Sequence, residues 1–190
     1  MDAERKFKVV FIGSGHAGKT SIIERFATNK FSEDIGPTIG TGFTTKDFEV
    51  PNGKITLNIW DTAGQELYKS LIPKYSQGAS AIIIVFDSTD VASFESAKRW
   101  YSSEKDMHEE DIIWFLVANK KDLHRQQIDI GQASEFATGN NMKFMQTSAK
   151  TGENIELLFC SIATELAKSL TNQISYQPNA PEPQEKKSCC

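Results

Sequence analysis

A glycine-rich stretch near the start of the chain has the residue types and spacing of a phosphate-binding loop. Residues 13–20 read Gly-Ser-Gly-His-Ala-Gly-Lys-Thr and fit the pattern G-x-x-x-x-G-K-[ST]. Glycines let successive backbone N–H groups turn inward around a polyphosphate. The lysine would neutralise the β- and γ-phosphates, and the threonine hydroxyl would ligate Mg²⁺. The stretch predicts a nucleotide-phosphate site made by Ser14, Gly15, His16, Ala17, Gly18, Lys19, Thr20 and the next residue, Ser21.

A second stretch, Asp-Thr-Ala-Gly-Gln at 61–65, would complete the phosphate end of this site. Asp61 is the expected carboxylate that holds Mg²⁺ through water, and the amide of Gly64 can sense a γ-phosphate. Gln65 would then orient an attacking water, which makes it the predicted catalytic residue. The pattern D-x-x-G is unspecific by itself, but its position one hairpin after a phosphate loop makes it a strong signal.

Two further stretches, Asn-Lys-Lys-Asp at 119–122 and Thr-Ser-Ala-Lys at 147–150, favour guanine as the base. The first alone would be taken for a solvated charged loop, but it directly follows an apolar strand pattern. Asp122 can accept hydrogen bonds from N1–H and the 2-amino group of guanine. The adenine of ATP would leave the carboxylate facing a lone pair, which costs about 1–3 kcal/mol or more of binding free energy. Lys120 can lay its methylene stem along the base, Asn119 can tie the loop to its neighbours, and Ala149 can offer its N–H to guanine O6. The predicted base-binding residues are Asn119, Lys120, Asp122, Ser148, Ala149 and Lys150.

The elements that must position these stretches alternate between strand and helix patterns. An apolar run at 7–12 precedes the phosphate loop, and a helical pattern at 21–26 follows it. Alternating runs at 43–50 and 55–60 flank a turn signal at 51–54 and predict a hairpin. Further strands are expected at 81–86, 112–118 and 142–147, with helices ending near 77 and spanning 91–106, 131–140 and 153–170. This order predicts an α/β fold: a doubly wound, mostly parallel six-stranded sheet with one antiparallel edge strand, helices on both faces, and ligands at the strands' carboxyl ends.

Composition places the chain among ordinary globular domains. Its 190 residues suffice for one well-buried domain, and its formal net charge of −4 gives no support for nucleic-acid binding. The longest apolar runs, at 81–86 and 112–118, are too short to span a bilayer, and the N-terminus has neither a signal-peptide core nor a myristoylation glycine. We expect one folded domain over residues 1–170 and a disordered tail at 171–190, which is rich in Asn, Gln, Pro and Ser.

The three cysteines offer neither metal-ligand spacing nor a disulfide framework. This indicates a reducing cytosol as the setting. Cys160 falls within a helical pattern, where a small buried apolar role is expected, whereas Cys189 and Cys190 are the last two residues of the chain.

The chain resembles a Ras-superfamily small GTPase over residues 6–170. The resemblance is carried by the order and spacing of five features: the phosphate loop, Thr38, DTAGQ, NKKD and TSAK. Within that superfamily the chain is most similar to the Rab branch, through residues 39–43, 75–79 and 84–89. The resemblance implies slow hydrolysis of GTP to GDP, accelerated by a partner, in a membrane-anchored switch that recruits effectors in vesicle trafficking. It also implies that Phe31 flanks the guanine, that the loops around Thr38 and from Gly64 onward are the two switch segments, and that the metal-binding residues are Thr20, Thr38 and Asp61.

The same resemblance implies an effector surface, a lipid anchor and a set of partners. Phe43, Trp60 and Tyr75 match the aromatic triad by which Rabs present their nucleotide state to effectors. Cys189 and Cys190 match a Rab double-prenylation end, and two lipid chains anchor stably where one is marginal. The protein would cycle between cytoplasm and the cytosolic face of a Golgi or endosomal membrane. Besides GTP, GDP and Mg²⁺, its partners would be effectors in the GTP state, an exchange factor, a GTPase-activating protein and a prenyl-binding escort or GDI, around a monomeric core without nucleic acid.

Several positions depart from the Rab pattern. Ile35 replaces the usual tyrosine that closes over the phosphates, and Leu67 replaces a basic residue on the partner surface. His16 and Ala17 are unusual in a phosphate loop, and we expect an outward, solvated imidazole at His16.

Three alternatives remain at this point. A metabolic phosphate-loop enzyme such as a nucleotide kinase is disfavoured by the guanine-type stretches and by the lack of an Arg-rich lid. A module that holds GTP permanently as a structural ligand is disfavoured by Gln65 and Thr38. A signalling switch outside trafficking is disfavoured by the aromatic triad and by the cysteine pair.

Overall fold

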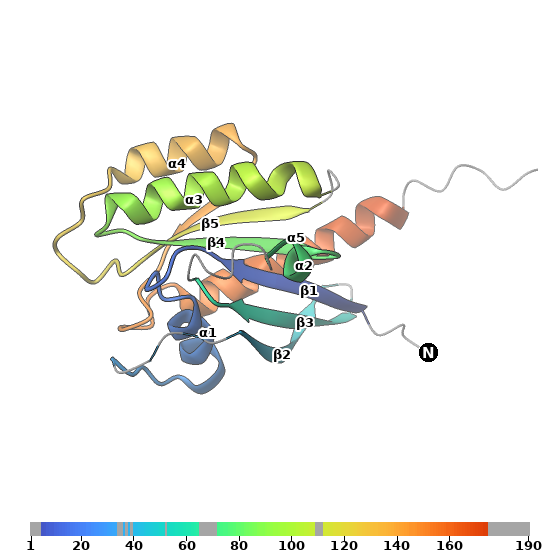
Figure 1. The fold of residues 1–190 in the computed structure, drawn as a ribbon. Coiled ribbons are helices and arrows are strands. Elements are labelled where there is room, and N and C mark those ends of the chain that lie inside the picture. The colour runs from blue at the N-terminus through green and yellow to red at the C-terminus, as the bar shows by residue number, and fades with distance from the viewer. Residues whose placement is uncertain are drawn as a thin grey trace, which may run out of the picture.

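Strands and helices alternate along the described chain in the computed structural model, except where β2 is followed directly by β3 (Figure 1). The structure describes residues 5–33, 36, 38, 40–51, 53–64, 72–108 and 112–174. Its elements are β1 (Arg5–Ile12), α1 (Lys19–Thr28), β2 (Thr41–Val50), β3 (Gly53–Thr62), α2 (Ile72–Ser76), β4 (Ala81–Asp87), α3 (Val91–Glu104), β5 (Ile113–Asn119), α4 (Ile130–Gly139), β6 (Lys143–Gln146) and α5 (Ile155–Ile174). Every strand and helix expected from the sequence is present, with ends that shift by a few residues.

Six strands form one sheet in the order β2-β3-β1-β4-β5-β6. β2 pairs antiparallel with β3 at the edge, and all the other pairings are parallel. The order reverses at β1, since the chain runs from β1 to β2 and β3 on one side and then to β4 on the other. In such doubly wound sheets, ligands bind outside the carboxyl ends of the strands at this reversal. The predicted fold class is confirmed.

The sheet buries both of its faces, as expected for strands that are apolar throughout. In β1, Val9 and Phe11 join a core cluster with residues of α1 and α5, whereas Val10 and Ile12 join a second cluster with residues of α3 and α4. Figure 1 shows α3 and α4 lying together on one side of the sheet. The carboxyl end of β1 is therefore held rigidly from both sides, directly before the phosphate loop.

The hairpin that carries β3 toward the site is tighter than predicted. Val50 pairs with Gly53, so a two-residue loop joins the strands, rather than the four-residue turn at 51–54. Gly53 has a φ of 115°, a backbone conformation that favours glycine. The register then runs without a break to the pair of Phe43 with Trp60 and brings Asp61 to the end of β3.

The structure corrects several details of the sequence prediction. Cys160 is exposed and not buried, because neighbouring positions of α5, including Phe159 and Ile162, turn toward the sheet and leave Cys160 on the outer face. α3 ends at Glu104 and continues only as a 3₁₀ turn over Lys105–Met107. α5 extends to Ile174, beyond the predicted domain boundary at 170, and the rest of the tail lies outside the described residues. Within the described part of the chain, the helices are too short or too polar to cross a bilayer.

Candidate functional site

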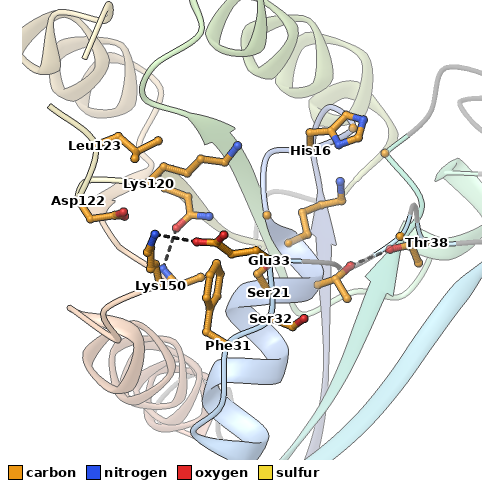
Figure 2. Close-up of a pocket in the computed structure, with 18 residues that line it drawn as sticks. His16, Ser21, Phe31, Ser32, Glu33, Thr38, Lys120, Asp122, Leu123 and Lys150 are labelled. Carbon is orange, nitrogen blue, oxygen red and sulfur yellow. Dashed lines mark hydrogen bonds and ion pairs between the residues drawn. The ribbon is translucent and has the colours of Figure 1, made fainter. Parts of the chain in front are cut away.

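A cavity of about 350 Å³ opens where the carboxyl ends of β1, β3, β5 and β6 meet (Figure 2). Its lining contains fourteen of the predicted site residues: Gly15, His16, Gly18, Lys19, Thr20, Ser21, Phe31, Thr38, Gly64, Asn119, Lys120, Asp122, Ala149 and Lys150. The lining also contains four residues that the sequence analysis did not select, namely Ser32, Glu33, Gly36 and Leu123. Four stretches far apart in the sequence thus share one cavity, as their positions at strand ends predicted.

The phosphate loop packs so closely on the sheet that two of its glycines have no room for a side chain. A Cβ at Gly13, where φ is 142°, would lie 2.1 Å from the carbonyl oxygen of Val85 in β4. A Cβ at Gly18, where φ is 89°, would lie 2.3 Å from Nδ2 of Asn119 at the end of β5. The loop is therefore shaped by contact with both strands and not by its own hydrogen bonds alone.

The N-terminus of α1 differs from those of α3 and α4. The side chains of Asp90 and Asp129 cap α3 and α4 by accepting from backbone N–H groups, whereas Gly18 offers no side chain to cap α1. Uncapped N–H groups and the helix dipole favour an anion at this end. The geometry fits a phosphate group in front of α1.

Lys19, the first residue of α1, is a buried cation with neutral partners. Its Nζ donates to the carbonyl oxygens of Gly13 and Ser14, each at 3.0 Å, and its exposed fraction is 5%. Burial lowers the pKa of Lys19 to about 8, although the charge of Asp61 opposes this shift. Among the described residues no carboxylate forms an ion pair with this ammonium, and a phosphate group would supply the opposite charge.

Three oxygen ligands of the kind that Mg²⁺ prefers converge beside Lys19. Thr20 donates from Oγ1 to Oδ2 of Asp61 at 2.6 Å, and its Oγ1 lies 2.7 Å from Oγ1 of Thr38. Oδ1 of Asp61 is buried and has no hydrogen-bond partner among the described residues. Burial raises the pKa of Asp61, and the Thr20 hydrogen bond and the Lys19 charge oppose this rise. An unpartnered carboxylate oxygen next to two hydroxyls fits a hard cation, so these residues are suited to hold Mg²⁺ directly or through water.

Asn119 joins the phosphate end of the cavity to its base end. Its Nδ2 donates to the carbonyl oxygen of Ala17 at 3.0 Å, and its Oδ1 accepts from Oγ1 of Thr147 and from N–H of Ala149, each at 3.2 Å. The side chain is 1% exposed. The Ala149 N–H, predicted to reach guanine O6, thus donates to Asn119.

Asp122 and Lys120 are each held by a neighbouring side chain. Ser148 donates from Oγ to Oδ1 of Asp122 at 2.7 Å, and Asp122 lines the cavity. Lys120 forms an ion pair of 2.6 Å with Asp87, at the end of β4. Burial alone would raise the pKa of Asp87, but hydrogen bonds from Lys120 and Thr89 outweigh it, so the pKa is lowered. Asp87 therefore fixes the lysine that would lie along the base, a role that the sequence analysis missed.

Two further segments border the base end of the cavity, the segment after α1 and the loop after β6. Glu33 and Lys150 form an ion pair of 2.8 Å, with Phe31 beside them (Figure 2). Arg25 of α1 donates from Nε to the carbonyl oxygen of Ala149 at 2.8 Å and from Nη2 to that of Lys150. Neither Arg25 nor Glu33 was predicted, because their partners lie more than 100 positions away in the sequence.

Comparison with known proteins agrees with this geometry. Residues 8–168 match the Ras family. The chain is 37% identical over 166 residues to "Ras-related protein Rab-11C" of Dictyostelium discoideum, covering 87% of this chain and 74% of that relative. It is also 37% identical over 168 residues to "GTP-binding protein ypt3" of Schizosaccharomyces pombe, covering 88% and 78%, and 36% identical to "Ras-related protein rab-11.1" of Caenorhabditis elegans, covering 88% and 80%.

The chain belongs to the Ras family. Its relatives make it a small GTPase of Rab type, so the predicted family is confirmed.

Some residues singled out in the sequence lie outside the described part of this Ras-family chain. These are Gln65, Ile35, Leu67, Cys189 and Cys190. Their assigned roles stay predictions. Ser14, Ala17, Asp61 and Ser148 are described but are not among the residues that line the cavity. His16 is exposed, as expected, and has a φ of 62°.

The predicted effector surface of this Rab-type chain is partly assembled in the structure. Phe43 is 56% exposed, and its ring meets that of Trp60 edge to face at 5.2 Å between centroids. Lys8 lies over the Trp60 ring and donates to the carbonyl oxygen of Gln77, just after α2. Tyr75 is half-buried on α2, and no ring contact joins it to the other two among the described residues. Lys8 therefore connects the Phe43–Trp60 pair to the helix that carries Tyr75.

Proposed function

We propose that this chain is a Rab-type switch in vesicle trafficking that binds GTP and GDP with Mg²⁺ and hydrolyses GTP to GDP. GTPase activity and a trafficking role are supported by the Rab-type relatives. The observation that carries the choice of nucleotide is the shared cavity, which has the buried ammonium of Lys19 at one end and the carboxylate of Asp122 at the other. A triphosphate would fill the first end, and guanine the second.

The chain's own residues supply position and charge and do not form a covalent intermediate. When bound, Mg²⁺ would neutralise charge on the β- and γ-phosphates, held by Thr20, Thr38 and, through water, Asp61. Lys19 and the backbone amides before α1 stabilise negative charge on the same phosphates. Gln65, which follows Gly64 at the cavity wall, orients the attacking water. Because the sequence shows no arginine placed to reach the phosphates, a partner would accelerate a slow intrinsic reaction, on the order of 10⁻⁴–10⁻² s⁻¹.

The other partners of the chain follow from its proposed role as a Rab-type switch. Phe43, Trp60 and Tyr75 would meet effectors in the GTP state, and separate proteins would promote exchange and hydrolysis. Prenyl groups on Cys189 and Cys190 would attach the chain to a Golgi or endosomal membrane, and an escort would shield them in the cytoplasm. Two chains give stable attachment where one gives marginal binding.

Base selection by Asp122 tests the central claim. Purified wild-type protein should carry guanine nucleotide and reject ATP. Asp122→Asn should weaken GDP binding by roughly 10- to 150-fold, because the amide presents a donor where guanine also donates. The same variant should gain affinity for xanthosine diphosphate, whose 2-oxo group accepts a hydrogen bond.

Asp129→Asn is a matched control, because Asp129 is an exposed carboxylate outside the cavity lining whose capping role an asparagine can keep. It should leave nucleotide preference unchanged. Protein that accepts ATP as readily as GTP, or an Asp122→Asn variant that prefers guanine as strongly as wild type, would contradict the proposed function.

A further inference from the structure

We propose that the ion pair between Glu33 and Lys150 is a latch over the base end of the nucleotide cavity, and that opening this latch sets part of the barrier to nucleotide release. The inference rests on the proposed function, because it concerns how the same cavity lets its nucleotide go. In this proposal Glu33 is a positioning residue, because it acts on the nucleotide through Lys150.

The two residues close the cavity from opposite walls. Lys150 donates from Nζ to Oε1 of Glu33 at 2.8 Å, across a separation of 117 positions in the sequence. Both side chains line the cavity, and so does Phe31, two residues before Glu33. In Figure 2 the ion pair lies beside the Phe31 ring and near Asp122. A base held by Asp122 would therefore lie behind the ion pair.

One wall of the latch is fixed by Arg25. Its guanidinium donates to the carbonyl oxygens of both Ala149 and Lys150 in the loop after β6. A third bond, from Nη1, runs 2.8 Å to the carbonyl oxygen of Asn29, the residue that ends α1. The backbone at Lys150 and the end of α1 are thus joined to one side chain. The part of the opposite wall that can move away is the segment after Asn29.

Phe31 and Glu33 both attach that segment near the base, in different ways. Phe31 packs against the core cluster formed with α1 and α5, and Glu33 reaches across to Lys150. Apolar packing at Phe31 is insensitive to salt, whereas an exposed ion pair is screened by it. The contribution of the latch to nucleotide release can therefore be separated from that of Phe31 by ionic strength.

The charge of Glu33 also acts on the position of the Lys150 ammonium. The hydrogen bond and charge of Glu33 are the main reasons why the pKa of Lys150 is raised, and Asp122 contributes less. The 2.8 Å contact with Oε1 holds the ammonium at Glu33, while its charge still acts on Asp122 nearby. For the same reason a charge-reversed pair is unsuitable as a test, since an acidic residue at position 150 would repel Asp122.

The side chains of Lys150 and Glu33 are 54% and 72% exposed, so the latch should affect rates and leave stability almost unchanged. The test follows release of fluorescently labelled GDP from full-length wild type, Glu33→Gln, Lys150→Gln and the double variant, with Mg²⁺ present, at 20 mM and 500 mM KCl. Lys54→Gln is the matched control. It breaks the exposed Lys54–Asp47 pair of the same 2.8 Å length, in the hairpin away from the cavity.

We expect Glu33→Gln to release GDP about two- to five-fold faster than wild type at 20 mM KCl. The double variant should be no faster than the faster single variant, and the ratio of Glu33→Gln to wild type should approach one at 500 mM KCl. A Glu33→Gln rate equal to that of Lys54→Gln, an acceleration unchanged by salt, or single effects that multiply in the double variant would each overturn the latch. Wild-type protein that binds no guanine nucleotide would instead overturn the proposed function.

Discussion

Replacing Asn119 with alanine should destabilise the protein and loosen both ends of the nucleotide cavity together. Asn119 is 1% exposed and makes three hydrogen bonds, to the carbonyl oxygen of Ala17, the hydroxyl of Thr147 and the N–H of Ala149. The first partner belongs to the phosphate loop, and the last belongs to the predicted base-binding loop. Alanine would leave all three buried partners without their bond to this side chain.

The magnitude follows from the number and burial of these bonds. Each intramolecular hydrogen bond contributes about 1 kcal/mol, and each buried group left unsatisfied costs about 1–3 kcal/mol. Some of this cost is recovered where water enters, so we expect a loss of roughly 3–5 kcal/mol in the free energy of unfolding. For a domain of this size, each 1 kcal/mol corresponds to about 2–4 °C, which gives a decrease in Tm of roughly 6–20 °C.

The assay combines thermal unfolding with GDP release, at one fixed GDP concentration because a bound ligand raises the apparent stability. GDP release should accelerate by tenfold or more, since a loss of about 1.4 kcal/mol in the free energy that holds the nucleotide is enough for a tenfold change. Asn140→Ala is the control, since Asn140 makes one side-chain bond, to the carbonyl oxygen of Phe136 at the end of α4. It should cost about 1 kcal/mol and leave GDP release unchanged. An Asn119→Ala variant that behaves like Asn140→Ala would refute the role of Asn119 as the connection between the two loops.

Four further changes test other parts of the site. Thr20→Ala should lower Mg²⁺ affinity by at least roughly tenfold and reduce the acceleration of GDP release by EDTA, because one metal ligand is lost. Gly64→Ala should retain GDP but lose the GTP-dependent change in limited proteolysis, because its Cβ would lie 2.5 Å from a phosphate-loop carbonyl oxygen. Gln65→Leu should slow single-turnover hydrolysis and leave GTP affinity nearly intact, whereas unchanged hydrolysis would remove Gln65 from the mechanism. Replacing Cys189 and Cys190 with serine should move the protein from the membrane to the soluble fraction of cells, and an unchanged distribution would contradict prenylation.

Much of the site could be predicted from the sequence because each motif lies directly after a strand. Asp61 lies at the end of β3, and Asn119 ends β5, while the phosphate loop follows β1. Parallel pairing then brings these strand ends to one edge of the sheet, so local patterns were enough to place residues that are distant in sequence. The hydrophobic pattern likewise predicted the sheet, since its strands are buried on both faces.

The residues that were missed act through contacts between their side chains and distant parts of the chain, which leave no periodic signal. Arg25 reads as an ordinary polar position of α1, and its role appears only once the loop after β6 lies against that helix. Asp87 and Glu33 each bind a lysine from another segment, so neither sequence neighbourhood reveals the partner. The burial of Cys160 was predicted wrongly for a related reason: an apolar helix pattern shows that one face is buried, but α5 is apolar beyond that face, with Leu157 also 54% exposed.

The phosphate end of the cavity explains how loss of one phosphate could release a whole segment. Oγ1 of Thr20 carries a single proton, which it donates to Asp61, so the hydroxyl of Thr38 must be the donor in their 2.7 Å contact. A cation that binds both hydroxyl oxygens would replace this bond with stronger ones, and a γ-phosphate would add a further partner for Thr38. Without them, this bond is the described side-chain attachment of Thr38, and a single hydrogen bond contributes only about 1 kcal/mol. That is less than the roughly 5.5 kcal/mol needed to move a two-state equilibrium from 1% to 99% in one state, so we expect the ion and the third phosphate to supply most of the free energy that holds Thr38 at the cavity.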